Sequence, residues 1–564
     1  MPMQGHGPMS NATSLRLRAH KGRNRQASNR YPRGMPHAQH LRRGSIFKKL
    51  LITLAVVLGL GIILVALEAF AGATARPTIA NDYGRQLHDL VLEQQRARLG
   101  PEAADGLNQR PAFVSVMQAV REANEWLREH ADELTEQDEG REDAYDDPWR
   151  YLSLDIIYAV PDEGTPEQFE RGRQRAIDAL QEWERRGVFD RSAELVDMHL
   201  VARAPGEGPM VDFLLPYLGV GRQLARAQAA RARLAAEAGD LDTLYSALEE
   251  TYVLGRQIAG QGLLIDWLVG AALHGLGRRM LLDNLLLYPV DDEAWLERVD
   301  AMIQREAIDR YPPIGDSLRG ERLFAADFTQ RCYTDNGKGN GRFIPVLYAK
   351  QIGQDPPDAG TLLTPFGDSR FSNMHGRLFL DRRELDAWID RAHELAHASA
   401  EATGANAIAA DNAFRAHVTS GDDWRNPASN FIPSFRRTIV TARGMRIEAA
   451  GTRVVLAIER YRLRNGGAIP RALDQLGDLL PDDLRADPFT AEPWDYQPTP
   501  VAETDDGDPL LPGAHAWPFT LESKPLAGGQ SSSSYRHAHN GLLITEPIQG
   551  PQYYEPFFET TDGP

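Results

Sequence analysis

Apolar residues between about 80 and 450 recur mostly at intervals of three and four, the spacing that places side chains on one face of an α-helix. The clearest such stripe consists of Leu241, Leu244, Leu248, Thr251, Gly255 and Ile258. Gly239 suits the end of one helix and Asp240 the start of the next, so a helical hairpin is predicted here, with a third helix from Leu264. Further helices are predicted over 85–98, 112–134, 166–187, 292–310 and 381–402.

Another helical stripe follows near the C-terminus, formed by Ile447, Gly451, Val454, Ile458 and Tyr461. The stretch NGG at 465–467 ends this helix, and Pro470 opens a short second segment that carries three leucines. The stretches PWDYQ (493–497), WPFTLES (517–523) and GLLIT (541–545) are typical of short strands that can pair. The pattern predicts a small module of one helix and a small sheet.

A different pattern lies near the N-terminus, where residues 50–67 contain no charged side chain. At about 1.5 Å per residue an 18-residue helix spans roughly 27 Å, near the hydrocarbon thickness of a bilayer. Six Lys or Arg lie in the twenty residues before Leu50 and two in the twenty after Leu67. The positive-inside rule then places the N-terminus in the cytoplasm and the bulk of the chain outside it.

Charged residues are also distributed unevenly on the two sides of this stretch. Residues 1–49 hold eleven of the 62 Lys and Arg residues and none of the 79 Asp and Glu residues. Clustered basic residues attract anionic lipid or nucleic acid. Because this tail is rich in Gly, Pro, Ser and Asn and lacks an apolar periodicity, we favour a disordered segment that sets the orientation, and we do not expect nucleic-acid binding.

Cleavage at ATA (73–75) is the alternative to a permanent anchor, because small residues there resemble a signal-peptide site. A signal peptide of this kind would be much longer than usual, which favours the uncleaved anchor.

Composition restricts the chemistry further. The 564 residues are 42% hydrophobic and 25% charged, as in folded soluble proteins, and Cys332 is the single cysteine, so no intrachain disulfide can form. The sequence contains no G-x-S-x-G, no phosphate-binding G-x-x-x-x-G-K-[ST] and no paired-cysteine metal signature. No cofactor is predicted.

One catalytic pattern does occur, HELAH at 393–397. In H-E-x-x-H two histidines one helical turn apart bind zinc and the glutamate is the general base, which would make His393 and His397 ligands and Glu394 the base of a metallopeptidase.

The surrounding sequence argues against that interpretation. The apolar face of this helix is formed by Leu385, Trp388, Ile389, Ala392, Ala396 and Ser399, and both histidines fall off it, among charged neighbours. We therefore expect His393 and His397 on a solvated face. The H-x-x-G-x-x-H continuation is missing, and only the fold could bring in Glu448 or His417 as a third ligand.

The C-terminal module resembles the C-terminal half of the type II secretion major pseudopilin. The resemblance covers residues 449–500 and rests on A-x-x-x-Y-R, N-G-x-x-P, L-x-x-L, D-P-F and P-W-x-Y, with Tyr461, Gly466, Pro470, Asp487, Pro488, Trp494 and Tyr496 at matching positions. It implies a long helix packed on a small sheet, with these residues in structural roles.

The N-terminus departs from that family. A pseudopilin begins its membrane helix directly after a processed glycine and carries glutamate at the fifth mature position, whereas Lys49 stands fifth after Gly44 here. The layout looks like that of uncharacterised bacterial membrane proteins with a helical ectodomain, and assembly into a fibre is not implied.

The predicted architecture is thus mainly α. It comprises a basic cytoplasmic tail (1–45), a transmembrane helix (46–72), a helical ectodomain (77–435), the pseudopilin-like α+β module (436–524) and a loose C-terminal tail (525–564). The predicted function is that of a single-pass inner-membrane protein that contacts lipid through 46–72 and binds or scaffolds an unknown envelope protein. The alternatives are the zinc metallopeptidase and a substrate-binding ectodomain.

Overall fold

The computed structural model describes residues 75–99, 108–129, 166–203, 208–210, 215–335, 338–348, 378–420, 425–498, 519–523 and 542–544, with a few short gaps, and scattered helical positions between 53 and 67. The chain divides into two units, Met1–Glu68 and Ala69–Pro564. Across this described part, no helix combines the length and apolarity needed to cross a bilayer. The predicted tail, 1–45, and most of the predicted membrane helix, 46–72, lie outside it.

The second unit is mainly helical, as the sequence predicts. Its α-helices are α2 (Tyr83–Leu99), α4 (Arg110–Glu129), α7 (Pro166–Arg185), α8 (Val188–Ala193), α9 (Pro216–Ala238), α10 (Leu241–Ala259), α11 (Leu264–Leu287), α12 (Glu293–Ile303), α13 (Ile314–Cys332), α16 (Arg382–Glu401), α17 (Gly404–Ser420) and α18 (Ser434–Arg464). Short helical turns are η3 (Glu194–Asp197), η5 (Gln304–Asp309), η7 (Pro427–Asn430), η8 (Leu473–Leu479) and η9 (Asp482–Leu484).

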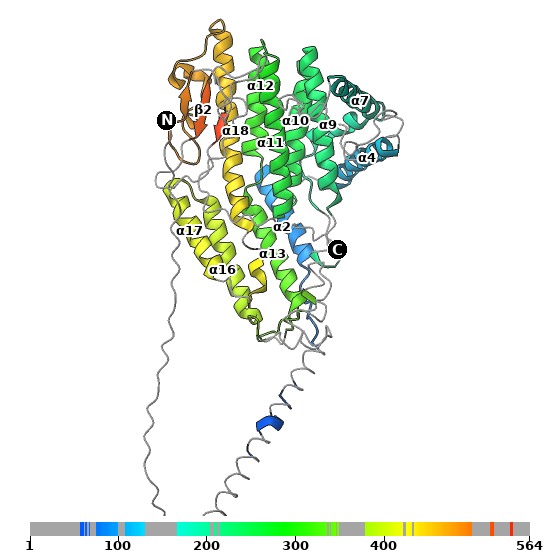
Figure 1. Ribbon diagram of the computed structural model, residues 1–564, viewed down its shortest axis with the longest axis vertical. Helices are drawn as coiled ribbons and strands as arrows, with labels where there is room; N and C mark the ends of the chain where they lie inside the picture. Colours follow the sequence, from blue (N-terminus) through cyan, green and yellow to red (C-terminus); the bar gives the residue numbers. More distant parts are fainter. Residues whose placement is uncertain are drawn as a thin grey trace, which may run out of the picture. The chain divides into compact units, whose positions relative to one another are not determined.

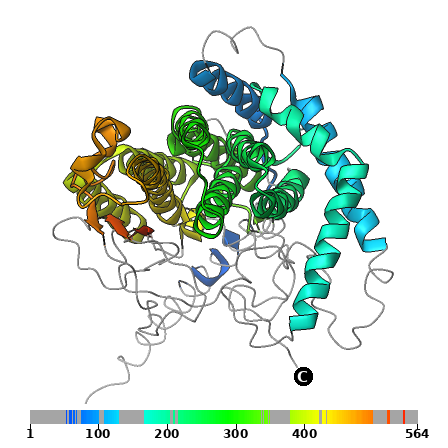
Figure 2. The same cartoon turned by 90° about the horizontal axis from the view of Figure 1, so that it is seen from above.

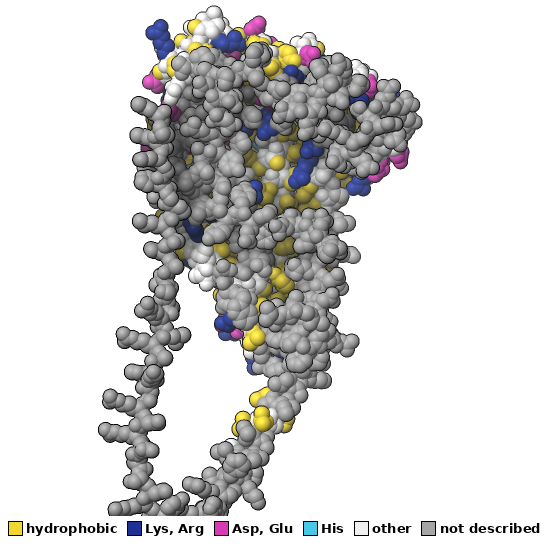
Figure 3. All heavy atoms as spheres, viewed as in Figure 1, with side chains coloured by type: hydrophobic (Ala, Val, Ile, Leu, Met, Phe, Trp, Pro, Cys, Tyr) yellow, Lys and Arg dark blue, Asp and Glu magenta, His cyan; other side chains and the backbone are white. Residues whose placement is uncertain are grey.

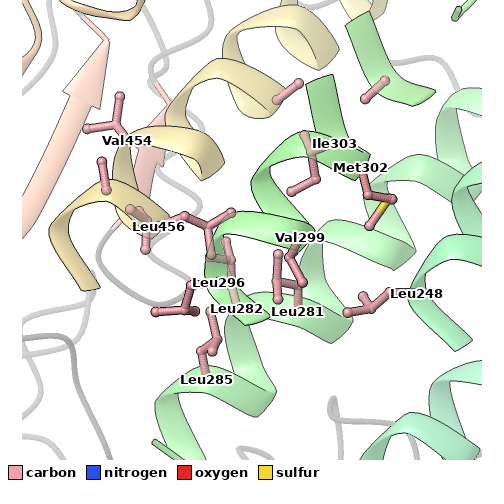
Figure 4. Packing of buried hydrophobic residues seen from close by; sticks show 14 of the residues in the cluster. Leu248, Leu281, Leu282, Leu285, Leu296, Val299, Met302, Ile303, Val454 and Leu456 are labelled. Carbon is pink, nitrogen blue, oxygen red and sulfur yellow. The ribbon is translucent and has the colours of Figure 1, made fainter. Parts of the chain in front are cut away.

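The long helices run side by side. Helices α9, α10 and α11 pack on one another, α11 and α12 both pack on α18, α4 and α7 lie beside α9, and the C-terminal strands lie beside α18 (Figure 1). Figure 2 shows these helices clustered when seen from the end of the bundle, and α13, α16 and α17 continue the body below α18 in the view of Figure 1. The largest apolar core lies where α10, α11, α12 and α18 meet (Figure 4), with Leu248, Leu281, Leu296, Met302 and Val454 among its members.

The predicted hairpin is confirmed at its turn. Gly239 takes the left-handed conformation (φ 73°) that ends α9, and the Asp240 side chain accepts a hydrogen bond from the Thr243 amide at 3.1 Å to start α10. The helix predicted over 292–310 differs: α12 ends at Ile303 and continues as the π-helical turn η5. Such turns are rare and are frequently found at functional sites. Helices α13 and α17 were not predicted.

At the C-terminus, β1 (Asp495–Gln497), β2 (Thr520–Ser523) and β3 (Leu542–Ile544) form one sheet in that order. Strands β1 and β2 are antiparallel, whereas β2 and β3 are parallel. Strand β3 belongs to the range 525–564, so three residues of the expected loose tail take part in the sheet. Phe519 and Leu521 are fully buried and join the core next to α18.

A close contact between backbones joins α13 to the turn before α11. Gly262 has a φ of 96° in that turn, and a Cβ at Gly320 would lie 1.8 Å from the Gly262 carbonyl oxygen. No side chain fits there, so both positions require glycine.

We expect Gly320→Ala to destabilise the protein by about 1–3 kcal/mol, because α13 must move away from this turn. Gly444→Ala in α18 is the matched control: its Cβ would meet no atom within 4 Å, and alanine favours helix, so its stability should be equal or slightly higher. Denaturant unfolding of the purified protein measures both. Parent-like unfolding of Gly320→Ala would show that the close contact is absent.

Candidate functional site

The HELAH sequence lies in the middle of α16, which packs against α13, α17 and α18. The helix begins with a capping box, in which the Asp381 side chain accepts from the Glu384 amide at 2.9 Å and the Glu384 side chain accepts from the Asp381 amide. Its buried residues are Leu385, Ile389, Ala392, His393, Ala396 and Ser399.

His393 therefore lies inside the protein, and the prediction of a solvated face is wrong for this residue. Its side chain is 7% exposed, and its ring packs edge-on against Phe435 of α18 with centroids 4.9 Å apart. Because α13 and α18 both cover α16, the buried face is wider than the apolar stripe alone indicates. Burial, with a smaller effect of the Arg322 charge, lowers the pKa of His393 to about 4, so the ring is neutral at pH 7.

Of the other two motif residues, Glu394 points to the surface, whereas His397 faces α13. Glu394 is exposed and forms an ion pair with Arg391 at 2.6 Å, while His397 is half-buried, with Nδ1 3.3 Å from Glu401 and Nε2 against Gly315 of α13. The motif thus places its first histidine in the interior and its glutamate at the surface, while its second histidine lies half-buried against α13.

The third ligands that the fold could have supplied are engaged elsewhere. His417 stacks on Trp388 and its Nε2 lies 3.0 Å from the Trp388 carbonyl oxygen, and Glu448 pairs with Arg278 at 3.2 Å. Within the described ranges, no three His, Cys, Asp or Glu side chains are placed to hold a metal ion together. This arrangement does not support zinc hydrolysis.

The motif residues of the C-terminal module make structural contacts. Gly466 (φ 62°) follows the end of α18, and the Tyr496 hydroxyl donates to the Pro470 carbonyl at 2.7 Å. The Trp494 indole donates to the Leu484 carbonyl at 2.9 Å. Asp487 Oδ1 accepts from the amides of Phe489 and Thr490, which holds the turn that contains Pro488. Tyr461 packs against the large core.

The most distinctive polar groups are ones that sequence analysis missed. Asp266, on the first turn of α11, is fully buried and accepts from Arg203 at 2.9 Å and from the Tyr217 hydroxyl at 2.6 Å. Burial raises the pKa of Asp266, and the Arg203 charge opposes that rise. Glu321 of α13 accepts from the Leu264 amide at 2.9 Å at the same helix start, and burial raises its pKa to about 7. The aspartate inside the apolar stretch LLIDWL was the available sequence signal.

A second buried carboxylate lies between α8, α9 and α10. Glu250 is 3% exposed and accepts from the Ser192 hydroxyl and the Gln228 amide, with Arg231 3.5 Å away. Burial raises the pKa of Glu250 to about 7. Ser192 is fully buried, so this serine–carboxylate contact joins helices and is not exposed to a substrate.

Comparison with protein-family models, with curated proteins and with solved structures finds no match. The geometry of the chain itself is therefore the basis of the functional argument.

The His393 ring makes stability depend on pH. Since its pKa is near 6.5 in the unfolded chain and about 4 in the fold, the unfolded chain binds an extra proton between these values. Lowering the pH from 7 to 5 should remove about 2 kcal/mol through this residue, and His393→Gln should not show this loss.

Denaturant unfolding of parent and variant at both pH values measures the effect. Phe435→Leu is the control, because it loosens the same contact without removing a titratable group, so its stability difference from the parent should be equal at both pH values. The same pH dependence in parent and His393→Gln would contradict a neutral, buried ring.

Proposed function

We propose that this chain is a single-pass protein of the bacterial inner membrane, whose helical body lies outside the cytoplasm and binds or scaffolds other envelope components. The observation that carries the proposal is the charge-free stretch 50–67, preceded by eleven basic residues and no acidic ones. The remaining chain is acidic, with 51 basic against 79 acidic residues, so the two sides of the stretch differ in charge.

The body supports a binding role more than a catalytic one. Its interior carboxylates Asp266, Glu250, Glu306 and Asp411 are each held by arginine, serine or amide groups from other helices. Groups used in this way stabilise helix packing. On the face shown in Figure 3, apolar side chains lie beside Lys and Arg side chains between the grey parts of the surface.

The C-terminal module adds a second argument. Its resemblance to a pseudopilin half is a resemblance to an extracytoplasmic assembly component, which fits the same side of the membrane. The module packs on α18 through the large core, so it would present its outer surface as one piece with the helical body.

Orientation is the first test. A reporter that is active only outside the cytoplasm, fused after residue 100, should be active in the full-length chain. A matched chain with Arg42, Arg43, Lys48 and Lys49 changed to Glu should lose most of this activity, because the positive flank is removed. An inactive fusion of the unaltered, membrane-inserted chain would overturn the orientation.

Metal content separates the proposal from the peptidase alternative. The full-length protein, purified in detergent and dialysed, should hold much less than one equivalent of zinc, because no third ligand lies beside His393 and His397 in the described part of the chain. The parent is to be compared with His397→Ala, which removes the more accessible histidine. One equivalent of retained zinc that disappears in His397→Ala would favour the metallopeptidase, with Glu394 as its base.

A further inference from the structure

One end of the helical body is formed by segments that are distant in sequence. We call it the anchor-side end and define it as residues 75–82, 332–335, 338, 340–343, 378–384 and 425. It contains the start of the body, the residues that follow α13 and the start of α16. The HELAH residues lie further along α16 and are not part of it.

Hydrogen bonds and an ion pair join these segments. The Thr78 hydroxyl donates to the Asp335 carbonyl at 3.5 Å, and the Asp335 carboxylate pairs with Arg382 at 3.1 Å. Arg425 Nε donates to the Leu378 carbonyl at 3.0 Å. The segment that begins the body is therefore fixed against the start of α16, about 300 residues later in the chain.

The two most exposed large apolar side chains among the described residues of the body both lie at this end. Ile79 is 56% exposed and Leu378 is 51% exposed. A single exposed apolar side chain is common on soluble proteins. Two of them beside basic residues, at the end of the body where the chain emerges, are typical of a surface that contacts a membrane interface.

The charge of this end differs from that of the body as a whole. The end carries six Lys or Arg residues against four Asp or Glu residues, whereas residues 50–564 carry 51 against 79. Its exposed basic residues are Arg76, Lys338 and Arg383. Its carboxylates start α2 and α16 or pair with Arg382, and they are Asp82, Asp335, Asp381 and Glu384. This end is therefore positive on a body that is negative overall.

The chain keeps this end close to the bilayer if the proposed membrane anchor is correct, and the inference rests on that proposal. Ala75 is eight residues after Leu67, the last residue of the charge-free stretch. Eight residues span at most about 28 Å even when fully extended. Helix α18 alone, with 31 residues, is about 46 Å long, so much of the body can extend beyond the reach of this tether. The anchor-side end is thus the part of the body that meets lipid first.

We propose that the anchor-side end docks on the surface of the bilayer and recognises anionic phospholipid. Arg76, Lys338 and Arg383 contact the anionic headgroups. Ile79 and Leu378 enter the interface between headgroups and acyl chains, where burial of apolar area adds to the attraction. Each basic residue near an anionic surface raises the ratio of docked to undocked body about fivefold. Docking holds the body in one orientation, so that its opposite end faces other envelope components.

The test uses the full-length chain with a fluorophore on one added cysteine. The chain is inserted in large vesicles of phosphatidylcholine and phosphatidylglycerol, in a ratio of about two to one, that carry a nitroxide quencher on some headgroups. Because Cys332 is buried, the added cysteine is the one that reacts. Asn340→Cys labels the anchor-side end, and Ala294→Cys labels an exposed position of α12 as the matched control. Strong quenching is expected for the Asn340→Cys label and little for the Ala294→Cys label.

Charge removal tests the recognition of anionic lipid. Lys338→Gln combined with Arg383→Gln should lower the ratio of docked to undocked body about 25-fold and thereby reduce the quenching of the Asn340→Cys label. Arg191→Gln combined with Arg471→Gln removes two exposed arginines from other parts of the body and should leave this quenching unchanged. Raising the salt concentration to about 1 M, where the Debye length is about 3 Å, should reduce the quenching without any substitution, so the test does not depend on the folding of a variant.

Two results would overturn docking while leaving the anchor intact. One is equal quenching of the labels at Asn340→Cys and Ala294→Cys. The other is quenching of the Asn340→Cys label that neither salt nor removal of the two charges reduces. A chain that alkaline carbonate washes off the vesicles would instead overturn the proposed anchor, and docking with it.

Discussion

The fold depends on pairing the polar groups that α11 carries into the interior. Neighbouring helices α9, α10, α13 and α18 all pack on this helix, and it is apolar on every side except for a few residues such as Asp266 and His274. Asp266 and His274 need partners from other parts of the chain, because a buried polar group without one destabilises the fold. Arg203 and Tyr217 donate hydrogen bonds to Asp266, and the Tyr252 carbonyl oxygen pairs with His274 Nε2. These pairings tie α11 to α9, to α10 and to the segment before α9.

The same burial gives the protein two opposed responses to pH. Glu250 and Glu321, with pKa values raised to about 7, bind protons in the fold that the unfolded chain has lost above pH 4.5, so through them stability falls as pH rises toward 7. His274 and His393, with pKa values lowered to about 4, act in the opposite direction below pH 6.5. In mildly acidic solution the effects of the two glutamates and the two histidines on stability largely cancel. Removing any one of these residues should therefore make the stability of the protein depend more strongly on pH.

Features fixed by neighbours along the chain could be predicted from sequence. The turn at Gly239 and Asp240 was found because its capping chemistry is local, and the strands around Tyr496 and Leu521 were found because their boundaries are set by nearby turns. The burial of His393 was missed because it depends on Phe435 and on α13, which are distant in sequence. Helical periodicity reveals one apolar stripe, whereas a helix covered from two sides also buries the residues beside it.

The partners of Arg203 and Arg256 could not be found from sequence for a similar reason. An arginine at the surface and one in a buried ion pair look alike until the fold brings Asp266 or Glu306 to it. The resemblance of the C-terminal module named the residues around Trp494, but their contacts with Leu484 and Pro470 are visible only in three dimensions.

The position of α2 has a consequence for the order in which the chain can fold. This first helix of the body packs on α13, and just before it the amides of Ala80 and Asn81 donate to the side chain of Gln330, about 250 positions later. Gln95 likewise donates to the carbonyls of Val201 and Gly260. A chain made from its N-terminus must therefore hold α2 without its partners until α13 has emerged, and such distant contacts form slowly. Helices α9 and α10 are neighbours in sequence, so their hairpin can form first. Helix α2, although it is made earliest, is therefore among the last parts of the body to reach its final contacts.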